Sequence, residues 1–136
     1  EIIPPSKLKK PLSEAKVALV TDGGLVPKGN PDHMVPVNSV KFAVYPIAGK
    51  ERLESKDYEV RHQGYDNSFV LEDPNRLVPV DAMRDLEHQK VFGKLADQFY
   101  TTAGVMTTLE NGKKFGTQIA QLLQKDGVDA VLLTST

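Results

Sequence analysis

The segment DAVLLTST, residues 129–136, decides the fold of this chain. Val131, Leu132 and Leu133 follow one another without a polar residue between them, which is typical of a parallel strand covered on both faces. Such a strand normally leads through a loop into a crossover helix. We therefore expect a buried strand here, in a sheet that is incomplete at the C-terminus of the chain.

The rest of the chain alternates between strand and helix patterns. Residues 16–21, KVALVT, are a second nearly continuous apolar run. Further strands are predicted at residues 40–45, 57–63 and 97–104, and helices at residues 78–89 and 111–127. In the last helix Phe115, Ile119, Leu122 and Leu123 share an apolar face, and Gly127 is placed to cap its end. The alternation predicts an α/β fold, a Rossmann-like or flavodoxin-like three-layer sandwich with a mainly parallel sheet.

The N-terminal segment differs from this pattern. Residues 1–15 contain Pro4, Pro5 and Pro11 and show little periodicity, so we predict an interdomain linker. Residues 16–136 then form the N-terminal part of the α/β domain. The chain does not begin with Met, and we expect it to be a fragment or a processed chain.

Composition excludes several classes of function. The net charge is -1, from 17 basic and 18 acidic residues, which argues against binding of a nucleic-acid backbone. The chain has no cysteine, so it has neither disulfides nor thiolate metal sites. No apolar run is long enough to cross a bilayer, and the N-terminal residues do not resemble a signal peptide. We therefore predict a cytoplasmic protein.

Two polar loops follow predicted strands. TDGG, residues 21–24, leaves the first strand, and TST, residues 134–136, leaves the last. Ligands of parallel α/β sheets lie outside the carboxyl ends of the strands. We expect these two loops to lie side by side at a ligand-binding edge.

Several motifs allow more than one interpretation. Gly23 and Gly24 permit close backbone approach and can expose N–H groups to an anion. The spacing from Gly24 to Gly29 resembles a phosphate-binding loop, but Asn30 replaces the expected Lys, and composition alone favours a plain surface loop. Residues 61–67, RHQGYDN, contain either a proton-transferring His62 or only a turn.

Other candidate groups favour structural roles. Arg76 and Arg84 can bind a substrate carboxylate, although ordinary ion pairs on a helix face are the favoured interpretation. The three histidines lack metal-ligand spacing, so no metal site is predicted. Ser135 lacks the G-x-S-x-G context of a hydrolase nucleophile.

Four segments, in this order and spacing, resemble a known family: TDGGLVPKGNPDH (21–33), HQGYDN (62–67), DPNRLVPVDAMRDLE (73–87) and GVDAVLLTST (127–136). They are similar to the selenoprotein subunit of component B of glycine, sarcosine and betaine reductases, which serve amino-acid fermentation in anaerobes. A weaker likeness is to the selenoprotein subunit of D-proline reductase. The resemblance covers nearly the whole chain, from about Pro11 to Thr136.

The resemblance implies a reaction and its participants. In this family TST leads directly to a selenocysteine followed by Gly-Thr-Cys, so we expect this chain to be truncated just before the selenocysteine and to be inactive alone. The family reductively cleaves a C–N bond of a small amino acid, with the selenolate as nucleophile. The implied partners are a pyruvoyl-bearing subunit of component B and the small selenoprotein A; component C then releases acetyl phosphate.

The matching motifs supply the candidate substrate-binding or active-site residues. These are Thr21, Asp22, Gly23, Gly24, Asn30, Asp32, His33, His62, Tyr65, Asp66, Thr134, Ser135 and Thr136. No catalytic residue, metal ligand or cofactor is predicted within the chain itself, and the uncovered edge beside the last strand can support a homodimer. Two competing hypotheses are a flavodoxin-like module that binds a small anion or nucleotide without redox chemistry, and a purely structural interaction domain.

Overall fold

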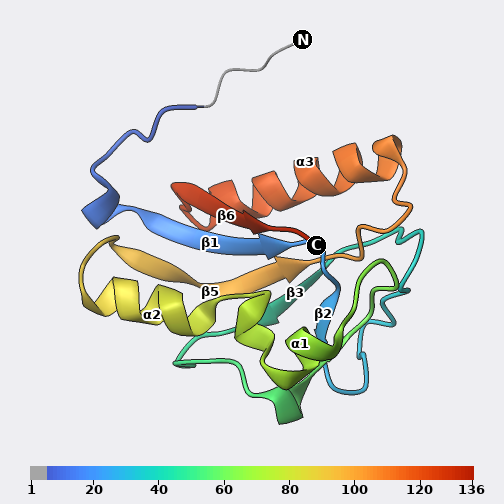
Figure 1. The fold of residues 1–136 in the computed structure, drawn as a ribbon. Coiled ribbons are helices and arrows are strands. Elements are labelled where there is room, and N and C mark those ends of the chain that lie inside the picture. The colour runs from blue at the N-terminus through green and yellow to red at the C-terminus, as the bar shows by residue number, and fades with distance from the viewer. Residues whose placement is uncertain (1–5) are drawn as a thin grey trace.

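Four strands form the main sheet of the computed structural model, which describes residues 6–136. Strands β1 (Lys16–Thr21), β5 (Lys94–Thr101) and β6 (Ala130–Thr134) run parallel, and β3 (Ala43–Pro46) is an antiparallel edge strand. The order across the sheet is β3-β5-β1-β6 (Figure 1). The predicted α/β class with a mainly parallel sheet is confirmed.

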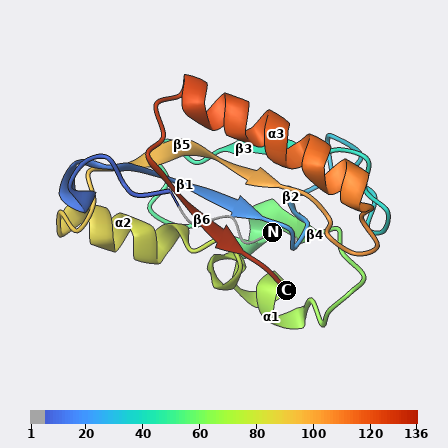
Figure 2. The same cartoon turned by 90° about the horizontal axis from the view of Figure 1, so that it is seen from above.

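Helices cover both faces of this sheet (Figure 2). Helix α3 (Leu109–Lys125) lies on one face, and α1 (Ser68–Glu72) and α2 (Val80–His88) lie on the other. The Thr108 side chain caps α3 by accepting a hydrogen bond from the Asn111 N–H at 3.2 Å. Gly127, with φ +68°, follows the end of α3, as the sequence predicts.

The alternation of side chains along β1 divides the core in two. Val17 and Leu19 belong to the cluster on the α2 face, and Ala18 belongs to the cluster on the α3 face. The buried residues of α3 are Phe115, Ile119 and Leu123. Leu122 was expected beside them, but 41% of it is exposed because it lies at the margin of this stripe, near Phe42.

Several short elements differ from the sequence prediction. Residues 21–33 are not entirely loop, since β2 (Leu25–Pro27) pairs antiparallel with β4 (Tyr58–Val60) in a separate two-stranded sheet. Strand β3 begins only at Ala43, and the segment of residues 61–67 is followed at once by α1, which begins at Ser68. Three single turns of 3-10 helix complete the fold: η1 (Leu12–Glu14), η2 (Ser55–Asp57) and η3 (Pro74–Arg76).

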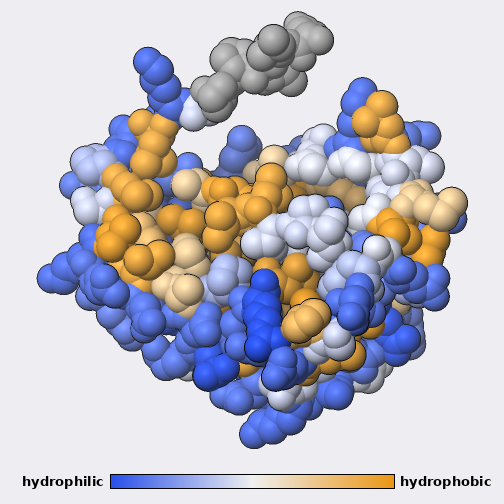
Figure 3. All heavy atoms as spheres, in the orientation of Figure 1, coloured by the Kyte–Doolittle hydropathy of each residue, from blue (hydrophilic) through white to orange (hydrophobic). Residues whose placement is uncertain are grey.

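Strand β6 is an edge strand, and the prediction that it is covered on both faces is wrong for residues 6–136. Val131, Leu132 and Leu133 are 43%, 39% and 73% exposed. Strand β6 pairs only with β1, no described strand lies on its other side, and neither core cluster includes these three side chains. Hydrophobic surface accordingly gathers in Figure 3 over the region where Figure 1 draws β6 and β1.

Of the predicted linker, residues 1–5 lie outside the described residues, whereas residues 6–15 lead through η1 into β1. None of the helices within residues 6–136 combines the length and the apolar character that a membrane crossing requires.

Candidate functional site

Backbone hydrogen bonds hold three strand ends together at the carboxyl edge of the sheet. The Asp22 N–H donates to the Thr134 carbonyl at 3.3 Å, across from β1 to β6. On the other side, the Gly104 N–H donates to the Asp22 carbonyl at 2.8 Å, and the Gly24 N–H donates to the Thr102 carbonyl at 2.9 Å. The TDGG and TST loops are therefore neighbours, as the sequence predicts, and the loop after β5 flanks them.

A side-chain contact joins the same two loops. The Ser135 hydroxyl donates to Asp22 Oδ2 at 2.9 Å. The other carboxylate oxygen, Asp22 Oδ1, is buried and has no hydrogen-bond partner within the described residues. A buried acceptor without a donor costs about 1–3 kcal/mol, and more when it is charged. Asp22 therefore has one carboxylate oxygen bound to Ser135 and one that is buried without a partner among the described residues.

The glycines of the first loop do not expose N–H groups to an anion, contrary to the sequence expectation. The Gly23 N–H donates to Thr21 Oγ1 at 3.1 Å, and the Gly24 N–H is used in the bond to Thr102. The Gly23 N–H is occupied by a local turn onto the Thr21 side chain, and the Gly24 N–H is occupied because the chain continues to pair with the segment after β5. Close approach at Gly24 is made by protein instead, since a Cβ there would lie 2.2 Å from the Arg61 carbonyl oxygen.

His62 and Tyr65 pack against the far side of this loop. His62 is buried, and its ring centroid lies 5.1 Å from that of Tyr65. The Tyr65 hydroxyl donates to the Gly23 carbonyl at 3.0 Å, and His62 Nδ1 accepts from the Gly64 N–H at 3.0 Å. This last bond assigns the hydrogen of the neutral imidazole to Nε2.

Burial governs the ionisation of this aromatic pair. Desolvation lowers the pKa of His62 below its ordinary value, and the Asp22 carboxylate partly opposes that shift. Desolvation, together with the charge of Asp22, raises the pKa of Tyr65 to about 12. At neutral pH both side chains are therefore uncharged, and Asp22 supplies the negative charge beside them.

Four of the candidate residues lie away from this edge or face solvent. The Asn30 side chain bonds the Met34 backbone in both directions, at 2.8 and 2.9 Å, which closes a turn. Asp32 and His33 are exposed in the same turn. Asp66 is exposed and accepts from the Ser68 N–H at the start of α1. The structure thus brings together residues 21–24, His62, Tyr65 and residues 134–136.

Neither the phosphate-loop spacing nor the arginines form a site. Strand β2 occupies the interval from Gly24 to Gly29, so this segment is not a loop wrapped around a phosphate. Arg84 is buried and donates to the Lys50 and Ile47 carbonyls at 2.9 and 3.0 Å. Arg76 forms an exposed ion pair with Glu72, and these contacts support the structural interpretation. Within residues 6–136 no cluster of three or more potential metal ligands occurs.

A cavity on the α3 side of the edge was not predicted. Its volume is about 470 Å³, and it opens between α3 and the ends of β1, β5 and β6. It is lined by Val20, Thr21, Asp22, Thr102, Gly104, Thr107, Gly112, Phe115, Gly116, Ile119, Leu133, Thr134 and Ser135. The sequence signal was the pair Gly112 and Gly116, two helix-disfavouring residues one turn apart inside an otherwise well-patterned helix.

Comparison with known proteins gives a consistent family. The model of "Glycine/sarcosine/betaine reductase selenoprotein B" matches residues 1–136. The chain is 44% identical over 134 residues to sarcosine reductase complex component B subunit beta of Peptoclostridium acidaminophilum. It is 47% identical over 134 residues to glycine reductase complex component B subunit gamma of Carboxydothermus hydrogenoformans. Each alignment covers 98% of this chain and 31% of the relative.

The weaker likeness that the sequence suggested is also found. D-proline reductase subunit gamma of Acetoanaerobium sticklandii is 36% identical over 141 residues, which cover 98% of this chain and 55% of the relative. No solved structure matches the chain. The chain spans about a third of the length of the component B relatives. Because the family model matches every residue, the chain belongs to the glycine/sarcosine/betaine reductase selenoprotein B family.

Proposed function

We propose that this chain is the part of a component B selenoprotein subunit that holds the nucleophile-bearing loop and one wall of the substrate pocket. The observation that carries the proposal is the junction of the TDGG and TST loops through Asp22 and Ser135, in a chain that matches the family along its whole length. The substrate is glycine, sarcosine or betaine, the compounds named in the relatives.

The chemistry proposed is reductive C–N cleavage. Selenocysteine, expected directly after Thr136, supplies a selenolate nucleophile when it is present, and the 136 residues of this chain do not include it. Residues Thr134–Thr136 hold the chain at the sheet edge, where Asp22 binds the Ser135 hydroxyl and the Thr134 carbonyl. A loop tied by two such bonds presents the following residue in a defined position, which favours orientation-dependent chemistry.

His62 and Tyr65 do not line the cavity beside α3, and they are proposed to belong to the active site from the other side of the TDGG loop. Both are neutral, both are largely desolvated, and Tyr65 fixes the Gly23 carbonyl. His62 is suited to hold or donate a proton at Nε2, because its Nδ1 is already occupied. Asn30, Asp32, His33 and Asp66 are proposed only as more distant parts of the substrate-loop region.

The wider organisation of the subunit is also a proposal. Residues 1–15 act as an interdomain linker, and residues 16–136 form the first part of a Rossmann-like or flavodoxin-like domain. The free edge of β6 is where further strands or a second copy would pair. The assembled enzyme is cytoplasmic and works with a pyruvoyl-bearing subunit, which activates the amine of glycine, and with the small selenoprotein A.

Reconstitution of the assembled reductase tests this function. The intact subunit with selenocysteine should release ammonia or methylated amine from one of the three substrates in the presence of a dithiol reductant. The matched variant with Ser in place of the selenocysteine should release none. Equal amine release by the two proteins, or no release from any of the three substrates by the selenium-containing protein, would refute the proposal.

A further inference from the structure

Strand β6 presents apolar side chains on the face of the sheet that carries α3. Val131 and Leu133 pair in register with Ala18 and Val20, which pack in the core cluster beneath α3. Residues in register on neighbouring parallel strands point to the same face, so Val131 and Leu133 point to the α3 side. They are nonetheless 43% and 73% exposed, and within residues 6–136 no helix lies over β6 (Figure 2). Helix α3 therefore covers only part of this face.

The flank of α3 next to β6 is uncovered as well. Gly116 lines the cavity between α3 and the strand ends, and Leu109 and Ala120 share its side of the helix, at i−7 and i+4. All three residues are exposed, and Leu109 is 76% exposed. Together with Val131 and Leu133 they form the walls of an apolar surface groove, which we name the α3–β6 groove.

Topology determines which face of the sheet a further crossover would cover. Connections between parallel strands are right-handed in about 98% of cases. The connection from β1 to β5 moves toward β3 and carries α1 and α2 on one face. The connection from β5 to β6 moves the opposite way and carries α3 on the other face. A further parallel strand beside β6 continues in this second direction, so its crossover helix must lie on the α3 face, over the groove.

The chain that leaves Thr136 is well placed to supply that helix. Thr134 and Ser135 line the cavity at one end of the groove, so a continuing chain starts at the mouth of the groove. The alignments cover 31% of the component B relatives, which therefore contain much chain besides the matched segment. Consecutive elements of α/β folds are usually adjacent in space, whereas a separate protein would have to find the groove by association.

We propose that the α3–β6 groove holds an α-helix of the same subunit, formed by residues that follow Thr136, and that the strand after this helix pairs with the free edge of β6. The helix runs beside α3 and in the same direction, because both lead back from the carboxyl edge of the sheet. Its apolar face buries Leu133 and the exposed part of Val131. The inference rests on the proposed function in one respect, which is that the intact subunit continues beyond Thr136.

Alkylation of single cysteines in the intact subunit tests whether the groove is covered. Ala120→Cys probes the groove flank of α3, and Gln118→Cys is the matched control on the opposite flank, beside Phe42. Both positions are exposed within residues 6–136, and both lie in the tryptic peptide of residues 115–125, whose mass reports the reaction separately from that of other cysteines. Iodoacetamide should react roughly tenfold or more slowly at Ala120→Cys, because the covering helix must open first. Equal rates would overturn the inference.

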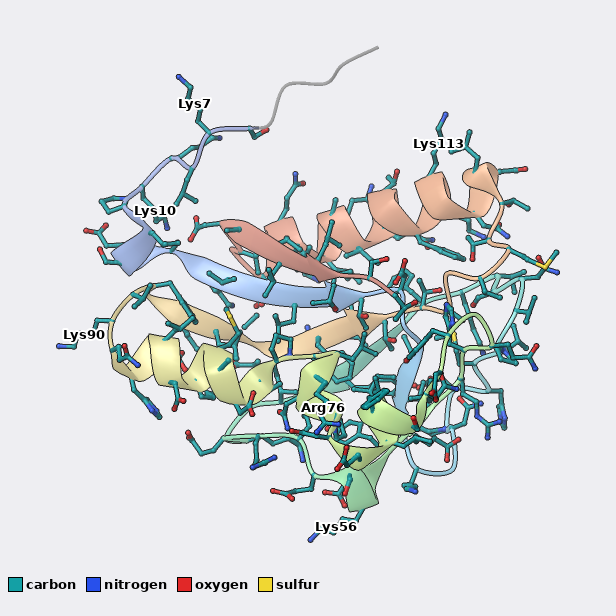
Figure 4. The ribbon with its side chains drawn as sticks, viewed as in Figure 1. Lys7, Lys10, Lys56, Arg76, Lys90 and Lys113 are labelled. Atoms are coloured by element: carbon teal, nitrogen blue, oxygen red, sulfur yellow. The ribbon has the colours of Figure 1, made fainter. Side chains whose placement is uncertain are left out.

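Photo-cross-linking identifies what covers the groove. Lys113, labelled in Figure 4 on α3, shares the groove flank with Ala120, whereas the neighbouring Lys114 shares the opposite flank with Gln118. Each lysine is replaced in turn by p-benzoylphenylalanine, and thermal unfolding verifies that the fold is retained. The first variant should cross-link within its own chain to residues that follow Thr136, and the second should not. If the first variant forms no such cross-link, or links only to a second copy or to another subunit, the inference is overturned.

Neither measurement requires turnover. If the reconstituted reductase is active but the two cysteines react at equal rates, the inference fails and the proposed function stands. If the residue after Thr136 carries no selenium and turnover is absent, while the cross-link to residues beyond Thr136 still forms, the proposed function fails and the assignment of the groove stands.

Discussion

Gly24 is the residue whose replacement most directly tests the geometry of the site. Its φ is +70°, a conformation that costs other residues roughly 1–2 kcal/mol. In addition, a Cβ would lie 2.2 Å from the Arg61 carbonyl oxygen, against 3.4 Å or more for ordinary contact. To relieve that clash the Arg61 backbone must retreat, which breaks the 2.7 Å bond from the Arg61 N–H to the Gly24 carbonyl.

The magnitude follows from adding these two effects. Loss of a buried backbone hydrogen bond costs about 1–3 kcal/mol, so Gly24→Ala should lower the free energy of unfolding by about 2–5 kcal/mol. Gly49 has the same φ of +70° but nothing within 4 Å of a built Cβ. Gly49→Ala should therefore cost only the backbone strain, about 1–2 kcal/mol.

Equilibrium unfolding in urea, under the same conditions for both variants, measures the two free energies of unfolding. Both variants carry the same backbone strain, so the difference between their free energies of unfolding reports the contact between Gly24 and the segment that carries Arg61 and His62. If Gly24→Ala and Gly49→Ala lower stability equally, the TDGG loop does not contact residues 61–62 as described. The placement of His62 and Tyr65 beside Asp22 would then be refuted.

Three further predictions concern charge and hydrogen bonding. Because burial lowers the pKa of His62 below the unfolded value of 6.5, the unfolded chain takes up a proton first, and stability should be lost as pH falls from 6.5 toward the folded pKa. His62→Gln should remove that part of the pH dependence in urea unfolding between pH 7.5 and 5. Arg84→Met leaves Glu87 without its ion-pair partner and should lower the free energy of unfolding by about 3–5 kcal/mol in the same assay. Arg76→Met removes one partner of an exposed ion pair and should lower it by less than about 1 kcal/mol. Equal losses of stability in the two variants would contradict the argument from burial. Ser135→Ala should leave unfolding unchanged but lower kcat of the assembled reductase about tenfold, which corresponds to about 1.4 kcal/mol, and Ser135→Thr should restore it. An unchanged kcat in Ser135→Ala would show that the bond to Asp22 does not position the loop.

Patterns of buried side chains made much of the fold predictable. Residues 16–21 and 130–134 are strands because continuous apolar runs suit a parallel sheet, and α3 follows from the spacing of Phe115, Ile119 and Leu123. The neighbourhood of the TDGG and TST loops follows from the rule that parallel strands end at the same edge. These features depend on local periodicity and on one rule of topology.

The features that were missed depend on long-range contacts. Strand β2 has three residues and pairs with β4 across about thirty residues of sequence, so it has too little alternation to be predicted, whereas β4 lies within the strand predicted at residues 57–63. The Gly24 N–H is occupied by the Thr102 carbonyl, a partner that only the fold brings near. The exposed faces of β6 differ from the prediction because a continuous apolar run shows that a strand tends to be buried, but does not show which segment covers it.

Mass spectrometry of the intact subunit tests the central claim most directly. Trypsin cleaves after Lys125, so one peptide begins at Asp126 and contains Thr134–Thr136. We predict that fragment ions of this peptide, from protein made in the presence of selenium, show the isotope pattern of selenium at the residue that follows Thr136. A residue without selenium at that position would contradict the assignment of this chain to the nucleophile-bearing part of the subunit.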